Sequence, residues 1–395
     1  MQNKISRRLS RQFNVFNIKN IFDIPMYTLL AMLSIFAISL ISLYSSDGGD
    51  FFQHTFKQIC YMIFSLLCFV LIISLNVTYI MDYAYLFLFA MTILLALVIP
   101  LGRNIMGASR WLNLGFISLQ PSEFAKLAII LALAKFYSKI PAQKIYKIST
   151  TFKAIMIVFV PIVLTAIQPD LATSTIMFSL TVIIIFISGT PRKQFYIAGV
   201  LAIISIPIAW IYALKDYQKL RILNFLIPGQ DILGSGYNVN QSKIAIGSGG
   251  LIGKGFLHGS QGQLKFIPEH HTDFIFTIVC EEFGFIGAMI LIGCYVYLIY
   301  YGLLVATKTN SVFGKITAIG CSSLLFLHTF INIAMTIGLM PVAGIPLLMM
   351  SYGGCGLLLG TICVALMVSV DVHKNVIETI FIFHIFRYSF YNLRS

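Results

Sequence analysis

Ten long apolar runs constrain the fold of this chain more than any other feature. A helix needs about 20 apolar residues to cross the roughly 30 Å of hydrocarbon in a bilayer. The runs lie at residues 24–44, 58–76, 80–100, 122–138, 153–168, 171–190, 195–214, 274–304, 314–338 and 345–370. Only 10% of the residues are charged, whereas a soluble protein would carry about 25%. The sequence therefore predicts an all-α polytopic membrane protein with about ten transmembrane helices.

The positions of Lys and Arg orient these helices, because short cytoplasmic loops of membrane proteins carry an excess of both. With a cytoplasmic N-terminus, the basic residues that fall inside are Lys4, Arg7, Arg8, Arg11, Lys19, Lys135, Lys139, Lys144, Lys147, Lys153, Arg192, Lys193, Lys308, Lys315, Lys374, Arg387 and Arg394. We expect a basic cytoplasmic tail over residues 1–23, a membrane domain over 24–371 and a cytoplasmic tail over 372–395. Basic residues that face anionic lipid then explain most of the net charge of +13, and we expect no nucleic-acid partner.

Two segments on the outer side depart from the hydropathy of a plain helix bundle. They are residues 101–122, between the third and fourth spans, and the long loop 215–273, between the seventh and eighth. The second mixes glycines, apolar residues and charges, which indicates ordered structure on the membrane surface. The outer Lys and Arg are Lys57, Arg103, Arg110, Lys126, Lys215, Lys219, Arg221, Lys243, Lys254 and Lys265, and most lie in or beside these segments. A polyanionic ligand would explain this clustering; solvated loop charge is the alternative.

The start of the eighth span carries two histidines and two carboxylates within residues 267–276. An Asp at a membrane helix centre costs roughly 2.5–3.5 kcal/mol and less near the interface, so Asp273 requires a partner, a wet cavity or a function. The adjacent His270 and His271 would project in different directions, which is poor spacing for one metal ion. We therefore predict no metal site here, and Glu269 and His271 are interpreted as supports for Asp273.

Other polar residues have local interpretations. Glu123 and Lys126 share one face of the fourth span and fit an i, i+3 ion pair. Trp111, beside Arg110, fits either an interfacial aromatic belt, which the residues alone favour, or a stacking platform for a sugar. Asp170 is predicted to be the N-cap of the sixth span. Further polar groups inside apolar spans are Glu281, Glu282, His328 and Asn332.

The glycine-rich stretch 234–255 is not a phosphate-binding loop. Ser248 stands where the motif requires Gly, and Gly255 follows Lys254 where Ser or Thr is required. A re-entrant or surface-lying segment with close backbone packing is predicted instead.

Four blocks resemble the SEDS family of bacterial cell-wall proteins. They read GASRWLNLG with QPSEFAKL (107–127), QPDLATS (168–174), residues 221–255 with 268–287, and PVAGIPLLMMSYGG (341–354). The block QSKIAIGSGGLIGKG is similar to the family members that act in cell elongation rather than division. The departures are Cys355, where Ser is expected, and Met349 with Met350, where Phe and a small residue are usual.

The resemblance implies a peptidoglycan glycosyltransferase that polymerises lipid II at the outer face of the bacterial cytoplasmic membrane. It also implies a complex with a class B penicillin-binding transpeptidase and work within the elongation machinery. The catalytic aspartate of the family maps onto Asp273, its important Trp onto Trp111, and its Glu and Lys onto Glu123 and Lys126. Asp273 is our candidate general base.

The remaining candidates are substrate-binding residues. Cations that face the pyrophosphate leaving group are expected among Arg103, Arg110, Lys126, Arg221 and Lys243, and Asp170 and His271 complete the candidate set. The chemistry requires no cofactor, although a divalent cation on the pyrophosphate stays open. The main rival function is a lipid II flippase that uses the same cavity; an ion-coupled transporter and a non-catalytic scaffold are weaker alternatives.

Overall fold

The computed structural model describes residues 20, 23–105, 108–113, 118–212, 214–227, 235–259 and 271–373. Within these ranges, each of the ten predicted spans overlaps a helix. The helices are α2 (Met26–Ser46), α3 (Phe56–Ser74), α4 (Val77–Leu101), α5 (Pro121–Ser138), α7 (Ile148–Ile167), α8 (Leu171–Ile187), α9 (Arg192–Tyr212), α13 (Ile275–Lys308), α14 (Val312–Thr336) and α15 (Gly354–Val372). A π-helical turn, η2 (Phe51–Thr55), leads into α3, and a short helix, α6 (Ala142–Ile145), precedes α7.

Seven of the described helices are long and apolar enough to cross a membrane: α2, η2 with α3, α4, α7, α13, α14 and α15. Helix α8 is a shorter apolar helix. Helix α5 has 18 residues, among them Glu123, Lys126 and Lys135, and nearly all of its side chains are buried in protein. The predicted class, an all-α polytopic membrane protein, is confirmed.

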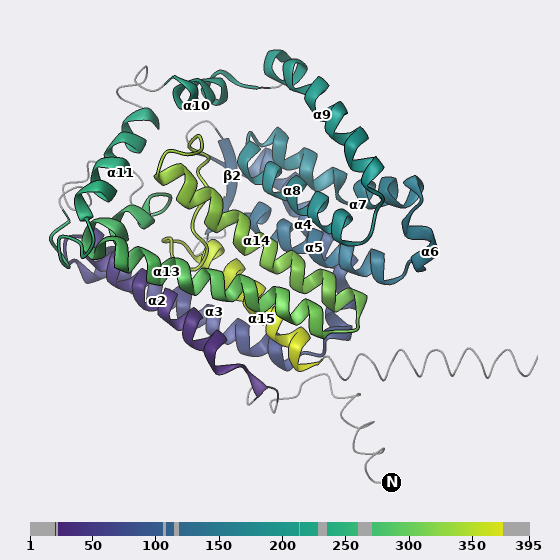
Figure 1. Ribbon diagram of the computed structural model, residues 1–395, viewed down its shortest axis with the longest axis horizontal. Helices are drawn as coiled ribbons and strands as arrows, with labels where there is room; N and C mark the ends of the chain where they lie inside the picture. Colours follow the sequence, from purple (N-terminus) through teal and green to yellow (C-terminus); the bar gives the residue numbers. More distant parts are fainter. Residues whose placement is uncertain are drawn as a thin grey trace, which may run out of the picture.

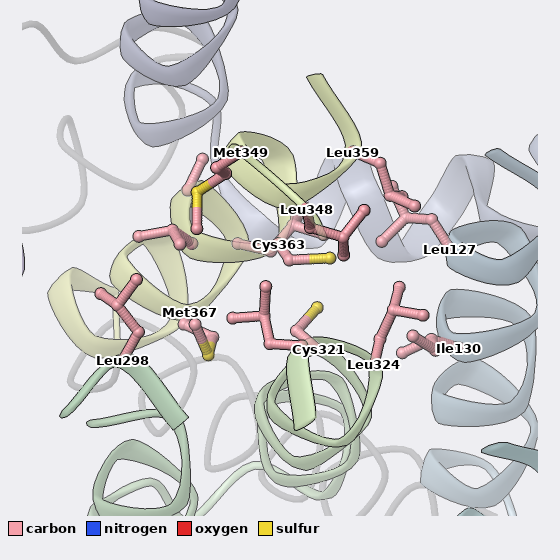
Figure 2. Packing of buried hydrophobic residues seen from close by; sticks show 14 of the residues in the cluster. Leu127, Ile130, Leu298, Cys321, Leu324, Leu348, Met349, Leu359, Cys363 and Met367 are labelled. Carbon is pink, nitrogen blue, oxygen red and sulfur yellow. The ribbon is translucent and has the colours of Figure 1, made fainter. Parts of the chain in front are cut away.

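Helix α5 lies in the middle of the bundle, where it packs against α4, α8 and α14, and α14 packs in turn against α13 and α15 (Figure 1). A Cβ at Gly320 of α14 would lie only 2.4 Å from Cγ2 of Ile130 in α5. The missing side chain therefore lets these two helices approach closely, as small residues do in membrane bundles. Figure 2 shows the resulting core, in which Leu127 and Ile130 face side chains from α14 and α15.

The other helices surround this core. Helix α13 packs against α2, α3 packs against α15, and α4 packs against α7. Helix α9 runs along the edge of the molecule, and most of its described side chains are exposed (Figure 1). Exposed apolar side chains on the outside of such a bundle face lipid, which is as apolar as they are.

The two unusual outer segments are both structured. Three described strands, β1 (Arg103–Ile105), β2 (Ala108–Asn113) and β3 (Ser118–Leu119), form a small antiparallel sheet of order β1-β2-β3. Hydropathy gave no sign of these strands. The loop between α9 and α13 contains α10 (Asp216–Leu226) and α11 (Ser235–Gly249), and α11 packs against α13. The described residues of that loop thus include two helices, and its place on the membrane surface stays a prediction.

The glycine-rich stretch enters a break in α13. Gly284 has φ 63°, ψ −160° there, which interrupts the helical hydrogen bonds. The N–H groups of Lys254 and Gly255 donate to the carbonyls of Glu281 and Glu282 at 2.9 and 3.0 Å. On the other side of the break, the N–H groups of Phe285 and Ile286 donate to the carbonyls of Gly250 and Leu251 at 2.9 and 3.1 Å. The predicted close backbone packing is confirmed.

The start of the last span requires a correction. The sequence predicts helix from residue 345, but α15 begins at Gly354, and residues 337–353 form a non-helical connection. Gly344, Met349 and Gly353 have positive φ angles, which a helix does not admit. The second half of the connection is nevertheless buried, at Ile345 and residues 347–351, and the connection forms the centre of the candidate site.

Candidate active site

The connection 337–353 is non-helical backbone inside a helix bundle. Its residues Leu347, Leu348, Met349 and Met350 are all 0% exposed. Buried carbonyls without water require donors from the protein. The donor pairs are Asn332 Nδ2 with Ile345 O (2.8 Å), His328 Nδ1 with Pro346 O (3.1 Å), Tyr295 Oη with Leu348 O, and Ser39 Oγ with Met350 O (2.6 Å). Side chains of α2, α13 and α14 therefore hold the connection in one conformation.

Asp273 lies in the turn that precedes α13, and partners distant in sequence hold the main chain of that turn. Three consecutive carbonyls each accept a hydrogen bond. The pairs are Tyr352 N with His271 O (2.9 Å), Ser351 Oγ with Thr272 O (2.6 Å) and Asn332 Nδ2 with Asp273 O (2.9 Å). A Cβ on Gly344 would lie 3.5 Å from Oδ2 of Asp273, so the carboxylate lies against the connection at a residue without a side chain. A carboxylate positioned in this way suits a general base.

A buried ion pair lies on the first turns of α5. Lys126 is 0% exposed, and its Nζ donates to Glu123 Oε1 at 2.7 Å and contacts His328 Nε2 at 2.8 Å. His328 Nδ1 faces the carbonyl of Pro346, which only accepts, so Nδ1 carries the hydrogen and Nε2 accepts from Lys126. The predicted i, i+3 pair of Glu123 and Lys126 is confirmed.

His328 and Asn332, one turn apart on α14, connect these two groups. His328 joins Lys126 to Pro346, and Asn332 joins the backbone of Asp273 to Ile345. Lys126 and Asp273 are thus both attached, through α14, to neighbouring carbonyls of one buried connection. The structure thus links Asp273 to the pair of Lys126 and Glu123, which is far from it in the sequence.

Two cations of the long loop also reach the connection. Arg221 of α10 donates through Nη1 to the carbonyl of Val342 at 3.3 Å. Lys243 of α11 lies over Gly338, where a Cβ would come within 2.5 Å of its Nζ. These predicted substrate-binding residues therefore lie beside the segment that carries Gly344.

Arg110 and Asp170 contact each other rather than the connection. Arg110 Nη2 donates to Pro169 O at 2.7 Å, and its Nε lies 3.8 Å from Asp170 Oδ2. Asp170 Oδ1 also accepts from Thr173 N at 3.3 Å, which confirms it as the N-cap of α8. Both residues therefore dock β2, the strand that carries the half-buried Trp111, on the turn between α7 and α8.

Some candidates lie outside what the structure describes. They are the side chain of Arg103 and the residues Glu269 and His270, together with Lys265. His271 is described, and its ring packs against His54 and Tyr352. Among the described residues, no group of three or more His, Cys, Asp or Glu is placed to hold a metal ion. A divalent cation on the substrate remains an untested expectation.

Sequence reasoning did not assign roles to several residues of this site. His328 and Asn332 had a signal, since polar residues one turn apart in an apolar helix mark functional or packing positions. Ser351 and Tyr352 had a weaker signal in the sequence, because they interrupt the last apolar run. Tyr295 and Ser39 had none, because single hydroxyls are common in membrane helices and their acceptors are distant in sequence.

The fold and the site together define a polytopic α-helical membrane protein with a fixed, polar site built from helix ends and the connection 337–353. Residues 20–376 match the family described as "Cell cycle protein", which groups FtsW, RodA and SpoVE. The chain belongs to this family, the SEDS proteins that its motifs resemble.

Named relatives agree with this assignment. The chain is 42% identical over 286 residues to peptidoglycan glycosyltransferase MrdB of Escherichia coli K12, an alignment that covers 72% of this chain and 77% of that protein. It is 30% identical over 344 residues to peptidoglycan glycosyltransferase RodA of Treponema pallidum, an alignment that covers 69% of this chain and 79% of that protein. The chain is an enzyme of this class, and the names of its relatives do not favour the flippase alternative.

Solved structures show the same fold. One chain, from work on the structural coordination of polymerization and crosslinking by a peptidoglycan synthase complex, superimposes with a TM-score of 0.77 at 27% identity and covers 89% of this chain and 98% of that one. RodA of Thermus thermophilus superimposes with a TM-score of 0.65 at 25% identity, covering 89% and 97%.

Proposed function

We propose that this enzyme polymerises lipid II into glycan strands and that Asp273 is its general base. One observation carries the assignment: the main chain of residues 271–273 is held at three consecutive carbonyls by α14 and the connection 337–353. Such a turn keeps the carboxylate of Asp273 in a constant place beside Gly344. Fixed geometry of this kind supplies much of the rate enhancement in transfer reactions.

The proposed step is a single displacement at the sugar carbon. The GlcNAc 4-hydroxyl of the acceptor gives its proton to a carboxylate oxygen of Asp273 while its oxygen forms a bond to the anomeric carbon of the lipid-linked MurNAc. The bond between that carbon and the pyrophosphate oxygen breaks, and undecaprenyl pyrophosphate leaves with the electron pair. General base assistance of this type typically contributes 10²- to 10⁴-fold.

Cations would stabilise the charge that develops on the leaving pyrophosphate. Arg221 and Lys243 are candidates to contact it, because they lie against the connection that carries Gly344, Arg221 at Val342 and Lys243 at Gly338. Lys126 is enclosed by Glu123 and His328, so it would act through its field and through the position of Pro346 rather than by direct contact. Trp111 remains a candidate platform for a sugar ring.

The enzyme would work with a partner protein and in one orientation in the membrane. A solved neighbour comes from a peptidoglycan synthase complex, which supports a class B penicillin-binding transpeptidase as partner. We place the chain in the bacterial inner membrane with residues 1–23 and 372–395 cytoplasmic. The hydrogen bond between Asn20 Nδ2 and His373 Nε2, 3.0 Å long, supports this, since it puts residues 20 and 373 on the same side of the bundle.

The test is polymerisation of labelled lipid II by the purified complex. Asp273→Asn should fold and bind the transpeptidase but lose activity by about 10²- to 10⁴-fold, because the amide cannot take the proton. Asp216→Asn, at the exposed start of α10, is the matched control and should polymerise normally. Polymer from Asp273→Asn at the wild-type rate would remove Asp273 as the base.

A further inference from the structure

Three aromatic rings meet at His271, two residues before Asp273. The ring of His54 stacks on that of His271, with centroids 4.6 Å apart and planes inclined by 19°. Tyr352 meets His54 edge-on at 4.5 Å and His271 at 5.9 Å. These rings come from the start of the second span, the turn before α13 and the connection 337–353. The rings therefore contact one another through tertiary packing alone.

Asp47, just after α2, holds the ring of His54. Its Oδ1 lies 2.7 Å from His54 Nδ1, and its Oδ2 accepts from the His54 backbone N–H at 3.1 Å. A carboxylate only accepts, so Nδ1 carries the hydrogen and the ring has one orientation. The side chain of Asp47 is 2% exposed, which shields this charged hydrogen bond from water. His54 itself lies in the π-helical turn η2, a geometry frequent at functional sites.

One turn further on, Gln58 fixes the backbone around Tyr352. Its Nε2 donates to Ser351 O at 3.2 Å, and its Oε1 accepts from Gly353 N at 3.2 Å. Burial, and then the charges of Tyr61 and Asp47, raise the pKa of the Tyr352 hydroxyl above its ordinary value, so this ring stays neutral at physiological pH. The beginning of the second span therefore contacts the turn 271–273 at the ring of His271 and the connection at Ser351 and Gly353.

We propose that Asp47 and His54 are positioning residues for Asp273. The inference rests on the proposed function, in which Asp273 is the general base. His54 holds the ring of His271, the ring fixes one end of a three-residue turn, and the turn places the carboxylate. A shift of about 1 Å at the reacting group can cost about 10²-fold in rate.

The geometry favours positioning over proton relay. Hydrogen bonds of an imidazole lie in the plane of its ring, whereas His54 and His271 meet face to face at 19°. A proton does not pass between rings stacked in this way. The two rings interact by packing, so a displacement of the His54 ring would displace the His271 ring.

The test is steady-state polymerisation of lipid II by the complex, with kcat and KM measured separately and thermal unfolding recorded for each variant. His54→Ala should lower kcat by about 10- to 100-fold with KM within about twofold, because the substrate contacts are intact while the base is displaced. His54→Phe keeps a ring to stack and should recover kcat to within about threefold of the wild type. Asp47→Asn should cost less than His54→Ala, since the amide oxygen still accepts. The exposed Lys57→Ala, one turn away, is the control and should behave as wild type.

Several outcomes would overturn the inference. His54→Ala with wild-type kcat would do so, as would a raised KM with unchanged kcat, which would make His54 a substrate contact. His54→Phe as slow as His54→Ala at the same unfolding temperature would show that the ring contact is not what matters. If His54→Ala fails to fold, His54→Phe and Asp47→Asn are compared with the wild type instead. Because His54→Phe keeps the ring, a loss of kcat in His54→Phe as large as that in Asp47→Asn, with KM and the unfolding temperature unchanged, would overturn the inference. Asp273→Asn measured alongside separates the two proposals: full activity there refutes the base assignment, whatever His54 does.

Discussion

Lys126 shows how much one residue depends on its neighbours in this protein. It is a fully buried cation whose described partners are one carboxylate oxygen and one imidazole nitrogen. Removing one partner of a buried ion pair leaves the other charge uncompensated, which costs far more than removing both. The pair therefore behaves as a unit in folding, whatever its part in catalysis.

We predict that Glu123→Gln and Lys126→Met each lower the free energy of unfolding by about 3–5 kcal/mol, and that the double variant recovers most of the loss. Unfolding followed in detergent micelles measures this. Lys193→Met, at the exposed start of α9, is the control and should change little. Additive losses in the double variant would contradict the pairing.

At the scale of elements, the break in α13 joins the long outer loop to the bundle. Gly284 has φ 63°, and a Cβ there would lie 2.3 Å from the backbone N of Gly253. Four backbone hydrogen bonds connect residues 250–255 with residues 281–286 across the break. The loop that carries Arg221 and Lys243 is thus anchored to the same helix that begins beside Asp273.

Gly284→Ala should destabilise the fold by more than the 1–2 kcal/mol that a left-handed conformation costs an L-residue, because Gly253 must also move. Gly293→Ala, on the same helix, meets nothing within 4 Å of its new Cβ and should stabilise by about 0.5–1 kcal/mol. Thermal unfolding of the two variants side by side checks the opposite signs. Equal effects would mean that the break is not a rigid junction.

At the scale of the whole molecule, one amide joins three parts of the chain. Asn332 of α14 donates to the backbone before α13 and to the connection before α15. Each buried carbonyl that loses a donor costs about 1–3 kcal/mol. The side chain therefore couples the global packing of the bundle to the position of the proposed base.

Asn332→Leu should lower both stability and kcat, because it removes these two donors at once. Thr329→Val on the same helix is the matched control: its hydroxyl has no hydrogen-bond partner among the described residues, so the variant should be neutral or more stable. Unfolding and lipid II polymerisation report the two effects. Full activity of Asn332→Leu would separate the site from this amide.

Most helices and the local pairs could be predicted from the amino-acid sequence, whereas the outer strands and the start of α15 could not. Apolar length predicts spans, and the spacing of Glu123 and Lys126, or the place of Asp170 before a helix, predicts contacts within one or two turns. These signals are local, so they can be read without knowing which helices are neighbours. The resemblance then pointed to Asp273 as the base, an assignment that the polymerisation assay will test.

The assembly of the site depends on contacts between segments that are distant in the sequence. Residues 345–353 are as apolar as a helix, yet side chains of α2, α13 and α14 satisfy their carbonyls in another conformation. The His54 ring reaches His271 because α3 packs against α15 and the connection before it. Hydrogen-bond donors and rings supplied from distant segments leave no periodicity in the sequence, so their partners become visible only when the bundle is folded.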